Sequence, residues 1–519
     1  MYSRILTGSI MGIDAETVTV ETDISSGLPS MTIVGLPDTS VREAKERIRS
    51  ALRNAGYQFP SKRITVNLSP ADSKKEGTHF DLPIAVGVMV ASGEISAGEA
   101  AQYAFFGELS LDGKVNAVQG AIALAIGLRN KGVRKLILPA GNRHEVSILT
   151  DMEIYPVAHI SDVEAHLSGM NPLMPFRGRP RKSSREVCES GEDFVDVAGQ
   201  EGVKRALQVA AAAAHNILMV GPPGAGKTMM ARRLPGILPT MTYEECLEVT
   251  RIYSLAGQLP AEGGLITQRP FRAPHHTISP TALAGGGSKP RPGEVPLAHF
   301  GVLFLDEFPE FCRKALEVLR QPLEDEKITI ARASATVTYP AKIMLVAAMN
   351  PCPCGNLGHS TRKCTCSEYQ VIQYRSKISG PLADRIDIHI EIFPVPYEEL
   401  IDSAGRNIKK GNSEQMRNAV EIARSVQIDR YRRERISYNS QLTPPLIKKY
   451  CPLDRESEQL LKMAFETYSL TARSGLKIIK LARTIADLEQ EENISAVHVA
   501  EAISYNRFYT ANRGGKANG

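Results

Sequence analysis

The sequence of 519 residues has no apolar run that approaches the roughly 18 residues of a membrane span. Its first residues, MYSRILTGSIMGIDAETV, lack the basic start and unbroken apolar stretch of a secretion signal. The eight cysteines form a poor disulfide framework, because four fall between positions 352 and 366 and the others are scattered. These absences predict a soluble protein of the reducing cytoplasm that does not contact a membrane.

The sequence also has little net charge of either sign. Lys and Arg number 62 against 57 Asp and Glu, a formal net charge of +5. Any surface that binds nucleic acid must therefore be a local basic patch, because the molecule as a whole has little positive potential. The composition, 43% hydrophobic and 23% charged, is ordinary for a globular protein. The length exceeds what one hydrophobic core usually serves, so about two or three domains are expected.

Residue patterning divides the chain into successive parts. Residues 1–168 alternate β-rich and helical segments and predict one compact α/β domain. Residues 169–193 are rich in Pro, Gly, Ser and Arg, which predicts a basic flexible linker. Residues 194–395 have the strand, Gly-rich loop and helix order of a parallel sheet with helices on both faces. Amphipathic periodicity predicts a helical lid over 396–510, followed by a tail at 511–519.

The segment GPPGAGKT carries the strongest chemical signal. It follows the apolar stretch NILMV and leads into the helical segment MMARRLPGIL, which is the context that a phosphate-binding loop needs. The glycines let backbone N–H groups turn toward phosphate oxygens, Lys227 would reach the β- and γ-phosphates, and Thr228 would ligate Mg²⁺. The predicted ATP-binding residues are Gly221, Pro222, Pro223, Gly224, Ala225, Gly226, Lys227 and Thr228.

Two carboxylates follow the apolar stretch GVLFL, where a parallel sheet presents its ligand-binding edge. Asp306 would hold Mg²⁺ through water, and Glu307 would polarise the attacking water as general base. Asn350 would align that water, the alternative being an Asx-turn residue before a proline. Arg385 would reach a neighbouring subunit's γ-phosphate, and Arg483 is weighed for phosphate sensing in the same way. A surface salt bridge is the alternative for both arginines.

Four of the cysteines lie in two C-x-C pairs, Cys352-Pro-Cys354 and Cys364-Thr-Cys366. Four thiolates in so short a stretch suit a tetrahedral Zn²⁺, with His359 as a substitute ligand. The alternative is a set of free or redox-active thiols. A bound zinc would staple a loop directly after Asn350, close to the nucleotide.

Two further segments are expected to be functional. Residues 268–301 are too long and too rich in Gly and Pro for a simple connection. In this segment, the adjacent His275 and His276 would point to opposite sides if the chain is extended. We therefore expect these two histidines to be packing or contact residues rather than metal ligands. Residues 328–339, ITIARASATVTY, predict a β-hairpin that would carry Arg332 toward a central pore.

With these segments identified, the chain resembles the magnesium-chelatase-like AAA+ proteins known as the YifB/ComM family. The strings that carry the resemblance are VGLPDTSVREAKERIRSAL, FRAPHHTIS, GGGSKPRPGEVPLAHFGVLFLDEFPEF, AMNPCPCG and LARTIADLE. The resemblance implies an α/β AAA+ phosphate-loop core with a helix-two insert, a pre-sensor hairpin that projects toward the pore, and a helical lid. It also implies assembly into a ring that is expected to be a hexamer. It implies Asn350 as the first sensor, Arg385 as the arginine finger in trans and Arg483 as the second sensor. Arg473 and Lys480 remain alternatives for that last role.

The first domain is similar to the proteolytic domain of Lon, a fold akin to ribosomal protein S5 domain 2. The matching stretch is LSLDGKVNAVQGAIALAIGLRNKGVRKLILPAGN. Lon-like proteases carry a Ser nucleophile and a Lys base, whereas the corresponding regions here read EGTHFDLP and QGAIALA. Because both partners of nucleophilic catalysis are missing, this domain is expected to bind DNA or a partner instead.

The resemblance implies an enzyme that uses ATP and Mg²⁺ to translocate DNA, as a helicase or branch-migration motor in homologous recombination or natural transformation. Lys289, Arg291 and Arg332 are expected to contact the DNA backbone. The basic linker either adds to these DNA contacts or is simply a solvated segment. The alternatives are a chelatase motor subunit, against which the Lon-like domain stands, and a protein-remodelling ATPase that acts on a protein partner.

Overall fold

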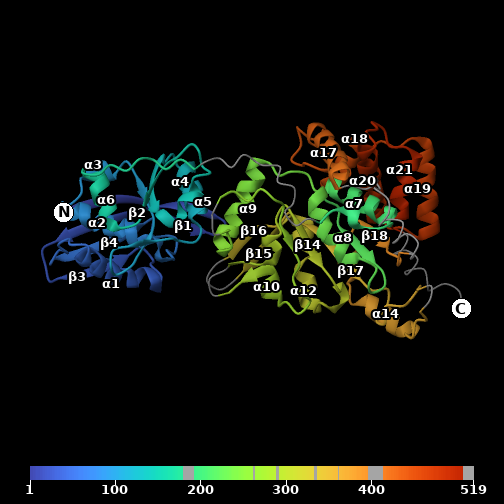
Figure 1. The fold of residues 1–519 in the computed structure, drawn as a ribbon, viewed down its shortest axis with the longest axis horizontal. Helices are drawn as coiled ribbons and strands as arrows, with labels where there is room; N and C mark the ends of the chain where they lie inside the picture. Colours follow the sequence, from blue (N-terminus) through green and yellow to red (C-terminus); the bar gives the residue numbers. More distant parts are fainter. Residues whose placement is uncertain are drawn as a thin grey trace. The chain divides into compact units, whose positions relative to one another are not determined.

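The computed structural model describes residues 1–178, 192–260, 264–287, 291–331, 336–359, 362–395 and 413–506 (Figure 1). The chain forms two compact units: Met1–Ser184, Cys246–Ile266 and Ala331–Thr338 make the first, and the remaining residues make the second. Several predicted features lie outside the described residues: 179–191 of the linker, 396–412 and 507–510 of the lid, the tail, Lys289 and Arg332. Within the described residues, no helix is long and apolar enough to cross a membrane.

The first unit is built on a seven-stranded sheet of order β3-β4-β2-β1-β5-β8-β9. Its strands are β1 (Tyr2–Met11), β2 (Asp14–Ser25), β3 (Ser30–Val34), β4 (Arg63–Ser69), β5 (Ala104–Phe105), β8 (Lys135–Pro139) and β9 (Glu153–Val157). β1 and β2 form an antiparallel hairpin in which Tyr2 faces Asp23 and Met11 faces Asp14. Every second residue of β2 from Val18 to Ile24 is buried, the two-residue period that pins one face of a strand to the core.

Helices cover both faces of this sheet. They are α1 (Thr39–Asn54), α2 (Asp81–Ser92), α3 (Ala97–Ala100), α4 (Ala121–Asn130), α5 (Arg143–Val146) and α6 (Ile160–Leu167). α2 is buried from Asp81 to Ala91, as a helix that is apolar on all sides must be. Ser3 of β1 donates to Gly87 of α2, whereas a Cβ on Gly8 would touch Leu124 of α4. Because residues 3 and 8 point to opposite faces of a strand, the two helices pack on opposite sides.

Helix α9 (Tyr243–Ala256) contributes its later turns to the first unit. Arg251 donates from Nη2 to the Ile13 carbonyl at 2.8 Å and to Asp14 at 2.5 Å. The Ser254 hydroxyl binds the buried carboxylate of Glu145. Burial raises the pKa of Glu145, while the hydrogen bond from Ser254 lowers it.

The second unit contains a parallel sheet of order β11-β14-β17-β10-β18. Its strands are β10 (Ile217–Val220), β11 (Phe271–Arg272), β14 (Val302–Leu305), β17 (Met344–Met349) and β18 (Ile388–Glu391). All residues of β10, β14 and β17 are buried, and such unbroken apolar runs are typical of strands covered on both faces. The sheet and its helices, α7 (Glu201–Ala213) and α8 (Lys227–Arg233) among them, confirm the predicted fold class. The hairpin expected at 328–339 is present as β15 (Lys327–Ala331) and β16 (Thr336–Pro340).

The described lid is helical. It comprises α17 (Ser413–Arg430), α18 (Pro444–Tyr450), α19 (Arg455–Tyr468), α20 (Ala472–Leu488) and α21 (Ala496–Ser504). A buried polar network holds it together around the Asp487 carboxylate, which accepts from Arg430 at 2.5 and 3.0 Å, from Arg483 at 3.1 Å and from Asn439 at 2.8 Å. Two guanidinium groups thus share one fully buried carboxylate.

Replacing Asp487 with Ala should destabilise the lid strongly, because it leaves Arg430 and Arg483 without their counter-charge. We expect the free energy of unfolding to fall by about 3–5 kcal/mol in urea denaturation. The matched control is Asp429→Ala on the exposed face of α17, which should change stability by less than about 0.5 kcal/mol. Equal stability of the two variants would contradict the importance of this network.

Candidate active site

A phosphate-binding loop connects β10 to α8 at the carboxyl edge of the parallel sheet. Gly224 and Gly226 have φ angles of 80° and 85°, in the left-handed region that favours glycine. A Cβ on Gly221 would lie 2.4 Å from the carbonyl oxygen of Ile392, so only glycine fits there. The loop opens into the first turn of α8, where unpaired N–H groups attract anions.

The Lys227 ammonium lies inside this loop. It donates to the carbonyls of Gly221 at 2.6 Å and Pro222 at 2.9 Å, and to Oδ1 of Asn350 at 3.2 Å. Burial lowers the pKa of Lys227, and the nearby Asp306 carboxylate acts in the opposite direction. Asn350 reaches the loop because β17, which it follows, pairs with β10 from Ile217 to Val220. The structure therefore brings together two site residues that lie far apart in the sequence.

The Thr228 hydroxyl donates to Oδ2 of Asp306 at 2.6 Å. A hydroxyl and a carboxylate oxygen this close form a suitable donor set for Mg²⁺, which takes oxygen ligands and retains several waters. Oδ1 of Asp306 accepts from the backbone N–H of Glu307 at 2.9 Å, which orients the carboxylate. ATP and Mg²⁺ fit this arrangement through Lys227, Thr228 and Asp306.

Glu307 has a left-handed backbone with φ of 52° and ψ of 43°, rare for a residue with a side chain. Its carboxylate is 56% exposed and lies 3.0 Å from Nδ1 of His276. The expectation that His275 and His276 point apart is wrong, because their rings lie 4.1 Å apart between centroids. The chain turns at residues 276–277 instead of running extended. The contact with Glu307 had no signal in the sequence pattern.

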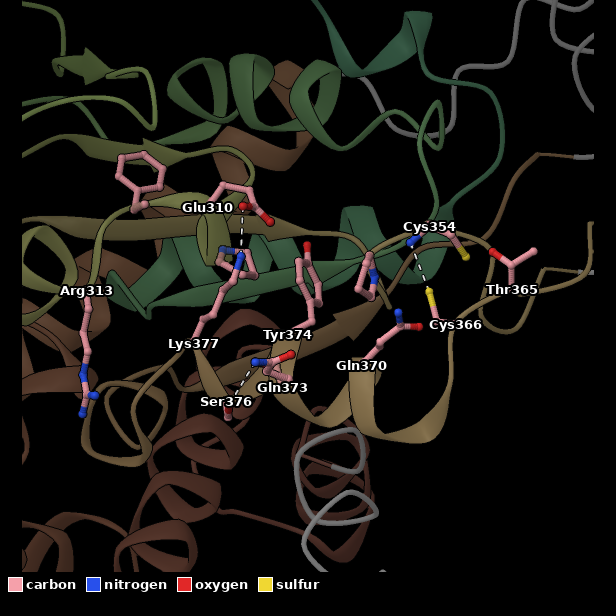
Figure 2. A pocket seen from close by; sticks show the side chains of 13 residues that line it. Glu310, Arg313, Cys354, Thr365, Cys366, Gln370, Gln373, Tyr374, Ser376 and Lys377 are labelled. Atoms are coloured by element: carbon pink, nitrogen blue, oxygen red, sulfur yellow. Dashed lines mark hydrogen bonds and ion pairs between the residues drawn. The ribbon is translucent and has the colours of Figure 1, made fainter.

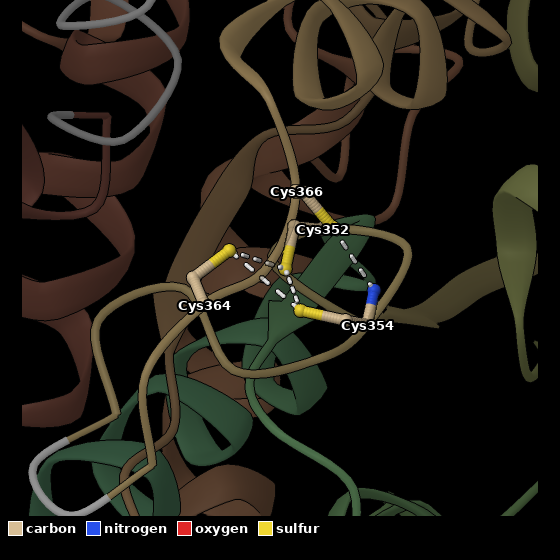
Figure 3. A group of neighbouring side chains, drawn as sticks. All are labelled: Cys352, Cys354, Cys364 and Cys366. Atoms are coloured by element: carbon tan, nitrogen blue, oxygen red, sulfur yellow. Dashed lines mark hydrogen bonds between the residues drawn. The ribbon is translucent and has the colours of Figure 1, made fainter.

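The four predicted cysteine ligands converge (Figure 3). The Sγ of Cys352 lies 3.4 Å from that of Cys354 and 3.7 Å from that of Cys364, and Cys354 and Cys364 are 3.6 Å apart. Cys366 completes the group, since all four sulfurs lie within 4.8 Å of one another. Zn–S bonds of about 2.3 Å place tetrahedral sulfurs about 3.8 Å apart, so the donor set fits zinc. His359 instead accepts a hydrogen bond from the backbone of Arg362 at 3.3 Å.

The cysteine loop is tied to both Asn350 and the phosphate loop. A Cβ on Gly355 would lie 2.6 Å from Cδ of Pro223, so the two loops touch. From α14 (Glu368–Ser376), Arg375 donates to the Pro351 carbonyl at 3.1 and 3.2 Å. Burial raises the pKa of Tyr374 to about 12, and a hydrogen bond with the Asn350 backbone acts against that shift. These α14 contacts were not foreseen from the sequence.

A cavity of about 960 Å³ opens beside the cysteine cluster (Figure 2). Its wall includes Cys354 and Cys366 on one side and Tyr374 of α14 on another. Lys377 crosses it to bind Glu310 at 3.0 Å, as Figure 2 shows. None of its lining residues belongs to the phosphate loop.

The predicted arginines form their contacts within this chain. Arg385 is buried, pairs with Glu324 and donates to the Pro381 carbonyl at 2.6 Å. Arg483 is 1% exposed, and its Nη1 and Nη2 donate to the backbone carbonyls of Glu492 and Glu491, each at 2.6 Å. Arg473, by contrast, is exposed in the first turn of α20.

In the first unit, the two segments likened above to the Lon nucleophile and base regions are partly buried. His79 is buried, with Nε2 3.0 Å from the Gly8 carbonyl oxygen. Burial lowers the pKa of His79 to about 4. The QGAIALA segment begins α4, where Ile122 and Leu124 are fully buried.

The parallel sheet, the phosphate loop and the polar residues that follow β14 and β17 define an ATPase of the AAA+ class. Family models agree: "Magnesium chelatase, subunit ChlI" matches residues 193–400, "Subunit ChlI of Mg-chelatase" matches 20–142, and "Magnesium chelatase, subunit ChlI C-terminal" matches 410–506. The chain belongs to the YifB/ComM family of magnesium-chelatase-like AAA+ ATPases.

Two relatives that match over nearly their full length support this assignment, and a third protein matches in part. YifB of Escherichia coli (strain K12) is 41% identical over 504 residues, 97% of this chain and 96% of that protein. Competence protein ComM of Haemophilus influenzae is 43% identical over 508 residues, again 97% of this chain and 96% of that protein. The DNA replication licensing factor mcm6 of Schizosaccharomyces pombe is 24% identical over 306 residues, 56% of this chain and 29% of that protein.

Proposed function

We propose that this ATPase couples ATP hydrolysis to movement along DNA, as a ring that drives branch migration or strand separation in homologous recombination or natural transformation. The observation that carries the proposal is the convergence of Lys227, Asn350, Thr228 and Asp306 at one sheet edge, beside Glu307. The names of two relatives, a competence protein and a DNA replication licensing factor, support DNA as the substrate.

Each site residue has a role that follows from its position. Lys227 exchanges its carbonyl partners for phosphate oxygens. Thr228 and Asp306 would hold Mg²⁺, which would supply positive charge to the phosphates. Glu307 takes a proton from water as the water attacks the γ-phosphate, and Asn350 orients that water. Arg385 acts on the nucleotide of a neighbouring subunit in a hexameric ring, after leaving Glu324.

The first test is steady-state ATP hydrolysis with and without single-stranded and four-way-junction DNA across a salt series. We expect DNA to stimulate the rate and salt to reduce the stimulation, because phosphate contacts release counterions. Glu307→Gln should lower kcat by about 100-fold or more with or without DNA. Glu310→Gln, three positions further on, is the matched control and should retain activity. A rate that ignores DNA at low salt would reject the DNA motor.

A second candidate is a chelatase-type motor that remodels a protein partner. It is favoured by the family models, which are named after a chelatase subunit and match the first domain as well as the core. The presence of the first domain is therefore not an argument against a chelatase-type motor. In the same assay, stimulation by a partner protein and none by DNA would select this reading or a protein-remodelling ATPase.

For the lid cation that senses phosphate, we favour Arg473. Arg483 as the second sensor stays a prediction, but moving it would break its bonds to Asp487, Glu491 and Glu492. Arg473 is exposed and close enough to Glu324 to lower the pKa of that carboxyl, as the ion-paired Arg385 does more strongly.

Substitutions of the two arginines should therefore affect different measured quantities, kcat for Arg473 and the free energy of unfolding for Arg483. Arg473→Ala should lower kcat by about tenfold or more without changing the free energy of unfolding. The substitution removes a cation that stabilises the negative charge developing on the phosphoryl group. Arg483→Ala should lower the free energy of unfolding by about 1–3 kcal/mol, measured in urea. A stable Arg483→Ala variant that has lost kcat, beside a fully active Arg473→Ala, would reverse the assignment.

We further propose that Cys352, Cys354, Cys364 and Cys366 bind Zn²⁺ as a structural ion. Protein purified without added metal should contain about one zinc per chain by elemental analysis. Cys354→Ser should lose the metal, whereas Cys312→Ser, an exposed cysteine outside the cluster, should keep it. Metal-free protein with four titratable cluster thiols would rule the site out.

A further inference from the structure

The cysteine cluster closes a loop that begins and ends beside the ATP site. Cys352 lies two residues after Asn350, and Cys366 lies one residue before the N-cap of α14. The Sγ of Cys352 is 3.7 Å from that of Cys364, which lies on the returning limb of the loop. The Cys354 N–H donates to the Cys366 sulfur at 3.4 Å. The cluster therefore joins the two limbs of the loop to each other, as Figure 3 shows.

The first limb contacts the phosphate loop. Gly355 follows Cys354, and its N–H donates to the Cys352 carbonyl at 3.0 Å, which closes a turn. A Cβ on Gly355 would lie 2.6 Å from Cδ and 2.9 Å from Cγ of Pro223. Because the proline ring is bonded to its own backbone nitrogen, it cannot rotate away from this contact as a flexible side chain would. A shift of Gly355 toward Pro223 would therefore displace the backbone of the phosphate loop.

The second limb returns to Asn350 through α14. Arg375 donates from Nε and Nη2 to the Pro351 carbonyl at 3.2 and 3.1 Å. A hydrogen bond also joins Tyr374 to the backbone of Asn350. The Asn350 side chain accepts from Lys227 at 3.2 Å. The chain from Asn350 through the cysteines to α14 thus folds back on its own start, and it meets the phosphate-binding segment at two points.

We propose that the cysteine cluster is a positioning device for the ATP site, and that the loop it closes acts on this site through two residues. Gly355 holds the phosphate loop through Pro223. Arg375 holds Asn350 through Pro351. Since the phosphate loop binds the nucleotide and Asn350 orients the attacking water, the first contact sets nucleotide affinity and the second sets the rate of hydrolysis. The proposal rests on these proposed roles in ATP hydrolysis and does not require DNA.

The first test compares two glycines of the same loop. Gly355 and Gly358 have φ angles of 80° and 79°, but a Cβ on Gly358 would meet nothing within 4 Å. Gly355→Ala should raise the Kd for a fluorescent ATP analogue and the KM for ATP about tenfold, because its Cβ displaces Pro223. Its kcat should change by less than about twofold. Gly358→Ala carries the same backbone strain and should bind the analogue as wild type does. Equal Kd values for the two variants would overturn the proposal.

A rescue experiment separates this contact from general strain in the loop. Pro223→Ala removes the ring atoms that the new Cβ would meet. The double variant Gly355→Ala with Pro223→Ala should therefore have the Kd of Pro223→Ala alone. If the two substitutions instead multiply the Kd independently, the loss belongs to loop strain and the proposal fails. The midpoint of thermal unfolding, measured for each variant, shows that the compared proteins are folded.

Arg375 is tested by the split between kcat and nucleotide affinity. Arg375→Ala should lower kcat about tenfold, the scale of losing a hydrogen bond from a charged donor, while the Kd for the analogue stays within about twofold of wild type. Arg375→Lys keeps a donor for the Pro351 carbonyl and should retain more of the rate. Arg362→Ala, exposed in the same loop, is the matched control and should hydrolyse ATP as wild type does. An unchanged kcat in Arg375→Ala, or an equal loss in Arg375→Lys, would contradict the role of Arg375.

A third arm uses wild-type protein and depends on the zinc proposed above. Dialysis against a chelator, followed by return to Mg²⁺ buffer, should raise the Kd for the analogue about tenfold as zinc is lost by elemental analysis. Complete metal loss without a change in Kd would overturn the proposal. If wild type holds no metal while Gly355→Ala and its rescue behave as expected, the zinc proposal fails and the positioning role stands. If wild type binds the analogue without hydrolysing ATP, the proposed function fails, and the Kd comparison still decides the role of Gly355.

Discussion

The pairing of β10 with β17 is the constraint on which the rest of the catalytic unit depends. It runs in register from Ile217 with Val346 to Val220 with Met349. Both strands are wholly buried, so their backbone groups must bond to each other. Because the strands are parallel, each delivers its carboxyl end to the same edge. The phosphate loop and Asn350 therefore meet without any attraction between their side chains being needed.

The parts predictable from the sequence were those in which function depends on local order. A buried strand, a glycine loop and a helix start are contiguous from Ile217 to Thr228, and β14 runs directly into Asp306 and Glu307. The two C-x-C pairs could be predicted to lie together because ligand type and spacing are themselves sequence properties, and their four sulfurs do converge. The α/β fold class could be predicted from the alternation of apolar strand segments with amphipathic helical segments along the chain.

The parts that could not be predicted depend on contacts between distant segments. His276 meets Glu307 only because β11 lies beside β14, an order that periodicity does not reveal. The anchoring of Pro351 by Arg375 requires knowing where α14 packs. Arg483 sits in a helix that suits a sensor, yet its partners at Glu491 and Glu492 lie beyond the end of that helix. Sequence position alone could not show that the Arg483 guanidinium bonds to carbonyl groups within the lid.

The left-handed backbone at Glu307 has a consequence for how this site can change over evolutionary time. Such a conformation costs of order 1–3 kcal/mol for a residue with a side chain and is relieved by glycine or asparagine. Substitutions of that kind would gain stability while removing the carboxylate. With Glu307 as the general base proposed above, stability and turnover are in conflict at this position. On the same proposed role, descendants of this chain that lose the need for hydrolysis would drift toward glycine or asparagine at position 307, and homologues that still hydrolyse ATP would keep glutamate.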